Sequence, residues 1–243
     1  MDRTGTAGAM MQPQLHMTFG WRYRLIKQHD FFVQQMRDRI LARFSNIEAE
    51  AEKYGEDEYE RIGNSPASEY DFRDMADVAE TANENAVEFY SLLDDLRKQA
   101  TLSAIAGMYH QWEKELRKFL ELEMRHYFKA DAVIKLAWVK DVRNLFDILK
   151  EFGWDCTALA FFTKIDACRL VVNVYKHGKG RSLNELNDKF PQYLNNPMRD
   201  FKIFDGHLDH EWLEVSDQQV SEFASAIREF WTTFPELLYW QKR

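Results

Sequence analysis

The chain of 243 residues has few of the residues that interrupt helices, since it contains 10 glycines and 5 prolines. Residues that favour helices, such as glutamate, lysine, leucine, alanine and glutamine, recur throughout. No useful length of sequence alternates apolar and polar residues with the period of two that marks a half-buried strand. We therefore predict an all-α fold, a helical bundle of long amphipathic helices.

Cysteines and long apolar runs are also scarce. The two cysteines, Cys156 and Cys168, do not have the spacing of a metal site. The chain lacks the roughly 20 uncharged apolar residues that cross a bilayer, and its N-terminal residues lack the apolar core of a secretory signal. No phosphate-binding Gly-rich loop and no Gly-x-Ser-x-Gly turn occurs. These absences favour a cytoplasmic protein without disulfides, membrane contact, metal or cofactor.

Charge is distributed unevenly along the chain. The net charge of −8 disfavours sequence-independent binding to polyanions. Residues 48–95 contain sixteen acidic and three basic side chains, whereas residues 164–181 contain five basic side chains and one acidic. The acidic run is interpreted as a solvated helix face, with docking of a basic partner as the alternative. The basic run marks a local site for an anion.

The expected organisation is a disordered N-terminal segment, residues 1–18, followed by a single all-helical domain over residues 19–243. Within that domain the weakest connections, near residues 55–67 and 191–215, are candidate sub-boundaries because glycine, proline and asparagine gather there.

Several helix ends have recognisable signals. A first helix is expected over residues 19–54, ending at Gly55, and a later one over residues 157–177, ending at Gly178. Ser182–Glu185 and Ser216–Gln219 match the capping box, in which two side chains satisfy the first free amides of a helix.

The helix expected over residues 157–177 is apolar around most of its circumference, so it is predicted to be central. One polar line interrupts it, because Asp166, Arg169, Asn173, Lys176 and His177 fall at helical spacing. Buried polar groups must be paired or face a cleft. One interpretation is structural: Asp166 pairs with Arg169, Asn173 binds a loop carbonyl, and His177 sits at the helix C-terminus, where the macrodipole favours a cation.

The other interpretation is metal-independent RNA cleavage, in which the 2′-hydroxyl of the RNA is the nucleophile. His177 is then the general acid and base. Arg169 and Asn173 bind and polarise the phosphate, and three further cations follow the RNA backbone, namely Lys176, Lys179 and Arg181.

The line of Arg169, Asn173 and His177 near the end of a late helix resembles the HEPN superfamily. That resemblance implies a helical bundle that forms homo-oligomers, with the arginine and histidine of two protomers in a composite ribonuclease site. It also implies a toxin or phage-defence role and a protein partner, either an antitoxin or a component of a defence complex. Four to six residues usually separate the arginine from the histidine, whereas seven separate Arg169 from His177.

Three other features of the sequence indicate alternative sites or surfaces. Glu123 and His126 have the Glu-x-x-His spacing of di-iron bundles, but no second copy occurs. Residues 205–211 gather two histidines and three acids in a loop, which is interpreted as a polar surface loop with a metal site as the alternative. The 7 tryptophans and 18 phenylalanines favour an apolar partner surface. A non-catalytic interaction or sensor subunit of a bacterial defence complex is therefore the alternative function.

Overall fold

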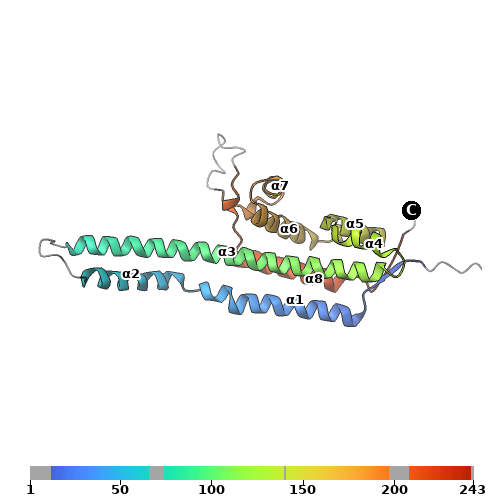
Figure 1. Cartoon of the computed structure of the whole chain (residues 1–243), viewed down its shortest axis with the longest axis horizontal. Coiled ribbons are helices and arrows are strands. Elements are labelled where there is room, and N and C mark those ends of the chain that lie inside the picture. The colour runs from blue at the N-terminus through green and yellow to red at the C-terminus, as the bar shows by residue number, and fades with distance from the viewer. Residues whose placement is uncertain (1–11, 66–73, 140, 197–207, 242–243) are drawn as a thin grey trace, which may run out of the picture. The chain divides into compact units, whose positions relative to one another are not determined.

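The computed structural model describes residues 12–65, 74–139, 141–196 and 208–241, and it confirms the all-α fold (Figure 1). The described residues form two compact units. Unit 1 contains those within residues 1–31 and 106–243, and unit 2 contains those within residues 32–105. Two helices, α1 (Phe19–Arg39) and α3 (Met75–Met124), contribute residues to both units.

Unit 2 is built around a pair of helices, α2 (Ile47–Gly63) and the N-terminal half of α3, which lie side by side in Figure 1. The 3₁₀ helix Leu41–Phe44 precedes α2. The rings of Tyr54 and Phe89 stack between the two helices with their centroids 4.4 Å apart. This stacking buries aromatic surface and fixes the register of α2 on α3.

The predicted helix end at Gly55 is wrong, because α2 continues through this residue to Gly63. A Cβ atom at Gly55 would lie 2.9 Å from the Cβ of Ala86 on α3, which is closer than real side chains approach. Gly55 is therefore a contact residue that lets two helices pack closely.

Unit 1 has the larger core. It contains the C-terminal half of α3 and most of the remaining helices: α4 (Ala130–Ile134), α5 (Val142–Glu151), α6 (Phe162–His177), α7 (Arg181–Lys189) and α8 (Asp217–Thr233). A π-helix, Lys135–Val139, follows α4, and short 3₁₀ helices occupy Cys156–Ala158, Pro191–Tyr193 and His210–Trp212.

Aromatic rings fill the centre of unit 1. Trp112 of α3 meets Phe230 of α8 edge to face, with ring centroids 5.2 Å apart. Trp154 packs on Phe234 at 4.6 Å. The first of these contacts joins α8 to α3, which lie side by side in Figure 1, and both account for part of the aromatic surplus that the sequence shows. Among the described helices, none has the length and apolar character of a membrane span.

The central position predicted for α6 agrees with its burial, since Ala167 to Val172 are all buried and the helix contacts both α7 and α8. It begins at Phe162 instead of residue 157, because a 3₁₀ turn over Cys156–Ala158 precedes it. The predicted stop at Gly178 holds: this glycine has φ +66°, a backbone conformation that side chains disfavour.

One of the two predicted capping boxes forms. The Ser216 hydroxyl accepts a hydrogen bond from the Gln219 amide, and the Gln219 side chain binds the Ser216 amide in return. The box predicted at Ser182 is absent, since the N-cap of α7 is Gly180, two residues before Ser182. The carboxylate of Glu185 binds cations instead of capping the helix.

The N-terminal segment 1–18 contains a strand where we expected disorder. β1 (Gln14–His16) pairs antiparallel with β2 (Leu237–Tyr239). Leu15 and Met17 are fully buried, so hydrophobic burial stabilises this end of the chain together with the strand pairing. Residues 1–11 lie outside the described residues.

Candidate functional site

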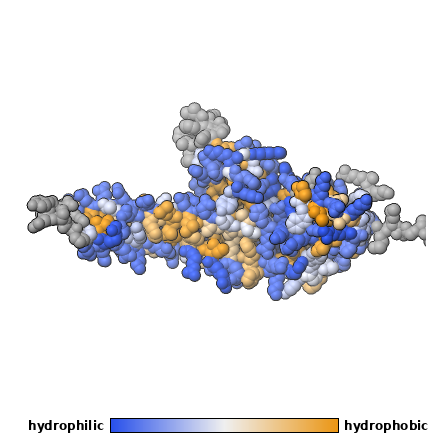
Figure 2. All heavy atoms as spheres, viewed as in Figure 1, coloured by the Kyte–Doolittle hydropathy of each residue, from blue (hydrophilic) through white to orange (hydrophobic). Residues whose placement is uncertain are grey.

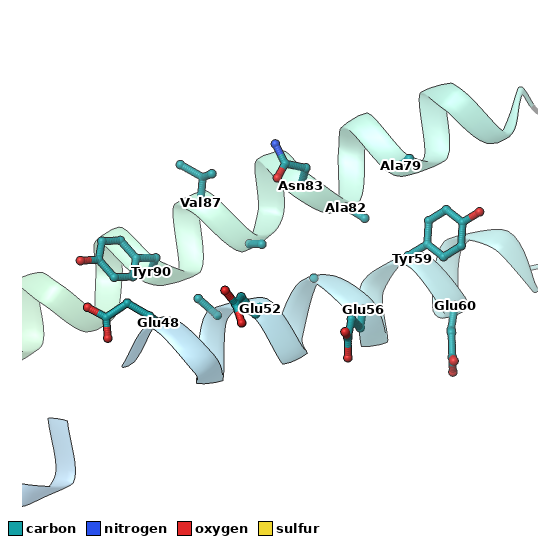
Figure 3. Close-up of a pocket in the computed structure, with 13 residues that line it drawn as sticks. Glu48, Glu52, Glu56, Tyr59, Glu60, Ala79, Ala82, Asn83, Val87 and Tyr90 are labelled. Carbon is teal, nitrogen blue, oxygen red and sulfur yellow. The ribbon is translucent and has the colours of Figure 1, made fainter. Parts of the chain in front are cut away.

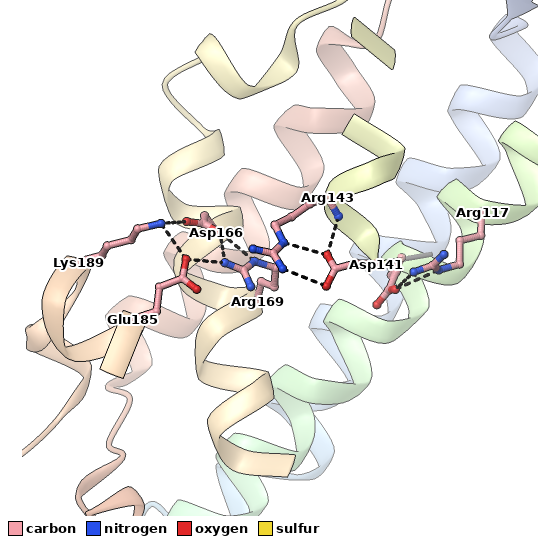
Figure 4. A network of polar contacts seen from close by, with 8 residues as sticks. Arg117, Asp141, Arg143, Asp166, Arg169, Glu185 and Lys189 are labelled. Atoms are coloured by element: carbon pink, nitrogen blue, oxygen red, sulfur yellow. Dashed lines mark hydrogen bonds and ion pairs between the residues drawn. The ribbon is translucent and has the colours of Figure 1, made fainter. Parts of the chain in front are cut away.

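The guanidinium of Arg169 is buried and bound by two carboxylates, as Figure 4 shows. Its Nε and Nη2 atoms donate to Oδ1 of Asp166 at 2.8 and 2.6 Å, and Nη2 lies 3.3 Å from Oε1 of Glu185. Only 6% of Arg169 is exposed. The Asp166–Arg169 pair is the one that the structural interpretation of the polar line predicts. For Arg169 to bind an RNA phosphate as predicted, that phosphate would have to displace both carboxylates.

Lys189 completes this group of charges and attaches α7 to α6. Its Nζ atom lies 2.8 Å from Oε1 of Glu185 and 3.6 Å from Oδ2 of Asp166. The hydrogen bond from Lys189 lowers the pKa of Glu185 despite partial burial, and Arg169 adds to this effect. We call Asp166, Arg169, Glu185 and Lys189 the α6–α7 ion-pair cluster. Its ion pairs link the two helices to each other.

Further arginines in the same region also donate hydrogen bonds to groups of the chain (Figure 4). Asp141 accepts a hydrogen bond from Nε of Arg143 at 3.1 Å and caps α5 through the Arg143 amide. Arg117, which is buried, donates to Glu113 and to the carbonyl of Ala137 in the π-helix. Each guanidinium drawn in this view therefore has a local acceptor.

The predicted catalytic groups lie apart along α6. Asn173 is half-buried, and His177 is exposed as the last residue of the helix. His177 follows Arg169 by eight positions, which is about 12 Å along the helix axis at 1.5 Å per residue. The two side chains therefore start from different turns of the helix.

The three predicted RNA-binding cations lie at the exposed end of α6 and the start of α7. Lys179 has a partner, because its Nζ atom lies 3.0 Å from Oδ2 of Asp209 and its hydrogen bond lowers the pKa of that carboxyl. Lys176 and Arg181 are exposed and make no ion pair with any residue that the structure describes. Lys164, at the other end of the basic run, binds Glu222 of α8. Much of the positive charge counted in the sequence is therefore neutralised internally.

The sequence did not predict that His210 lies against the turn at Gly178. His210 packs on Gly178, where a Cβ atom would lie 3.3 Å from the imidazole Cδ2. Its Nδ1 atom is 3.0 Å from Oδ1 of Asp209. The end of α6 therefore has two histidines nearby, His177 and His210. The signal that was missed is the glycine itself, whose conformation admits the imidazole ring.

Neither predicted metal alternative has a free set of ligands in the described residues. Asp209, His210 and Glu211 place one ligand atom each within 4.8 Å of one another, but the ammonium of Lys179 already binds Asp209. Asp205 and His207 lie outside the described residues. The carboxylate of Glu123 accepts the backbone amide of His16 at 2.8 Å.

A groove in unit 2, between α2 and α3, has a volume of about 820 Å³ and is lined by charged and apolar side chains. Small residues form its floor, which lets the groove run between closely packed helices: Ala51, Gly55, Ala79, Ala82 and Ala86. Tyr59 and Tyr90 lie near its two ends, as Figure 3 shows. Val87, with 61% of its surface exposed, lines the groove from α3.

Four glutamates of α2 line the same groove at every fourth residue: Glu48, Glu52, Glu56 and Glu60. All four are exposed, and Figure 3 shows them spaced along the helix. No lysine or arginine within the described part of the chain makes an ion pair with them. We call this feature the acidic groove. It differs from the α6–α7 ion-pair cluster in that its charges face solvent and have no internal cation.

The acidic run predicted over residues 48–95 includes residues of both α2 and α3. The acids that line the groove come from α2, and α3 supplies alanines, Asn83 and Val87. The four-residue spacing of the glutamates was the available signal, since it places them on one helical face. No family model matches the chain, and no curated protein or solved structure is significantly similar to it.

Proposed function

We propose that this chain is a non-catalytic helical interaction protein that binds another protein through the acidic groove of unit 2. The observation that carries the proposal is the combination of exposed apolar side chains and unpaired carboxylates along one groove. Contiguous exposed apolar surface on a folded protein is typical of a binding site. Figure 2 displays apolar surface over the part of the molecule that α2 and the first half of α3 form.

The charges of the two sites also favour protein binding over RNA cleavage. A ribonuclease of the HEPN kind needs an arginine that is free to bind the scissile phosphate, and Arg169 is buried against Asp166 and Glu185. The acidic groove repels nucleic acid, because phosphates and glutamates carry charge of the same sign. A protein partner is therefore better supported than RNA.

The test is co-purification of the full chain from its own source cells. We expect a stoichiometric protein partner with the wild type and loss of that partner with the double variant Glu52→Lys/Glu56→Lys. The matched control is Glu50→Lys/Asp57→Lys, which reverses two exposed charges on α2 that do not line the groove. Equal recovery of the partner by both variants would refute the proposal.

The second candidate is the metal-independent ribonuclease activity to which the HEPN resemblance points, in a toxin or phage-defence role. The observation that favours it is the exposed His177, with Lys176 and Arg181 nearby and His210 packed on Gly178. In this candidate a second protomer completes the site, and an antitoxin or defence-complex protein restrains it.

RNA cleavage in EDTA separates the two candidates. The first candidate predicts no cleavage by the folded wild type. The second predicts cleavage that is lost in His177→Ala and retained in His110→Ala, which removes another half-exposed histidine. Light scattering on the same samples measures whether the active species is a homo-oligomer.

A further inference from the structure

We infer that the partner of the acidic groove is a basic amphipathic helix of another protein, with a lysine or arginine at every fourth position and an apolar stripe beside the cations. This inference rests on the proposed function and specifies the chemistry of the partner. Three properties of the groove carry it: its length, its charge spacing and its apolar lining.

The length of the groove matches about three turns of helix. Glu48 and Glu60 are twelve residues apart on α2, which corresponds to about 18 Å at 1.5 Å per residue. An extended peptide of the same length would have about five residues, too few to meet all four carboxylates with side chains on one face. A helix lying along α2 presents cations at the matching rise of about 6 Å per four residues.

The carboxylates of the groove determine that the partner carries positive charge. Glu48, Glu52, Glu56 and Glu60 lie along one edge of the groove without a basic lining residue. Four carboxylates about 6 Å apart repel one another, and a partner that supplies cations relieves this repulsion. Charge complementarity of this kind accelerates association and selects against acidic partners.

The apolar lining selects an amphipathic helix over a merely basic segment. Val87, Tyr59 and Tyr90 are exposed hydrophobic residues that line the groove. Helices that bind in grooves place apolar side chains at positions three and four apart into such a surface. A flexible polycation would satisfy the glutamates and leave the apolar surface in water.

A second copy of this chain is a poorer occupant. Its own basic run ends in a turn that contains Gly178 and Gly180, and Lys179 there is already bound by Asp209. The short helix that follows, α7, carries Glu185 in the ion-pair cluster. The basic run and α7 thus do not form a basic helical stripe that matches the groove in length.

The experiment uses the full-length chain and a synthetic helical peptide of about 16 residues, which spans the groove with a margin. The peptide carries lysine at every fourth position and leucine on the adjacent face. Two control peptides have the same leucines with glutamine in place of lysine, or the same lysines with serine in place of leucine. Affinity is measured by titration calorimetry at two salt concentrations.

The wild type is expected to bind the lysine–leucine peptide in a one-to-one ratio and to bind it more weakly at high salt. Glu52→Lys/Glu56→Lys is expected to reduce the affinity about tenfold, since each exposed pair contributes modestly and two attractions become repulsions. Glu50→Lys/Asp57→Lys should retain it. Val87→Asn should weaken binding several-fold, whereas Leu92→Asn, which alters an equally exposed residue of α3 outside the groove, should not.

Equal binding of the glutamine or serine control peptide would overturn the inference, and so would equal affinity in the two double variants. If the co-purified partner depends on the groove while the lysine–leucine peptide fails to bind, the proposed function stands and the basic-helix inference falls. If the groove variants change the oligomeric state of the chain, the occupant is a second copy, and the inference is likewise wrong.

Discussion

Replacing Arg169 with methionine tests whether this residue stabilises the fold or takes part in catalysis. Methionine keeps most of the apolar stem and removes the charge, so Asp166 and Glu185 are left with Lys189 alone. Removing one partner of a buried ion pair costs about 3–5 kcal/mol. Because the side chains of Asp166 and Glu185 remain 19% and 21% exposed and Lys189 still binds both, we expect a loss of about 2–3 kcal/mol in the free energy of unfolding.

The assay is urea unfolding followed by circular dichroism, with a fall in melting temperature of about 5–10 °C as a second measure. The compensating variant Asp166→Asn/Arg169→Met/Glu185→Gln removes the unpaired charges together with the arginine. It should regain about 1 kcal/mol or more relative to the single variant, since no buried charge is left without a partner. A single variant that loses less than about 0.5 kcal/mol while partner binding or RNA cleavage disappears would refute the structural role.

Three further predictions concern other parts of the fold. His29 is buried, and its Nε2–H donates to the backbone carbonyl oxygen of Ala224 at 2.8 Å. Burial lowers the pKa of His29 from its usual value of about 6.5, so the unfolded chain takes up the proton first and the free energy of unfolding falls as the pH drops below about 6.5. His29→Gln should reduce this effect in pH-dependent urea unfolding. Lys189 lowers the pKa of Glu185. The stability that this carboxylate contributes is therefore present above its unfolded pKa and is lost on acidification below about pH 4.5. Glu185→Gln should flatten the pH dependence of the free energy of unfolding in that range. Gly55→Leu should destabilise the chain by about 1–3 kcal/mol through overpacking against Ala86, whereas Gly20→Leu, at a position with open space, should change the unfolding free energy little.

Local signals in the sequence predicted local structure. Few glycines and prolines indicated the all-α fold, Gly178 marked the end of α6, and the Ser216 box marked the start of α8. Each depends on side chains within a few residues of one another, so no knowledge of the tertiary packing was needed.

The missed features depend on partners distant in sequence. Gly55 has the sequence signature of a helix break, and only the proximity of Ala86 explains why α2 continues through it. β1 is three residues long and depends on a strand near the other end of the chain. The spacing of Asp166 and Arg169 indicated an ion pair, but the second carboxylate, from Glu185, is contributed by another helix.

The acidic groove was visible in the sequence only as charge. The spacing of the glutamates places them on one face of α2, but the face that meets the alanines of α3 follows from packing. The sequence therefore indicated an acidic surface over residues 48–95 but not which of its acids would line the groove.

Site-specific photo-crosslinking in the source cells tests the central claim most directly. A photoreactive amino acid replaces Val87 in the groove or Leu92, an equally exposed residue outside it. The account predicts that position 87 crosslinks to one protein through a basic helix of that protein, and that position 92 gives no such product. Crosslinks of equal yield from both positions, or none from either while the wild type cleaves RNA through His177, would contradict it.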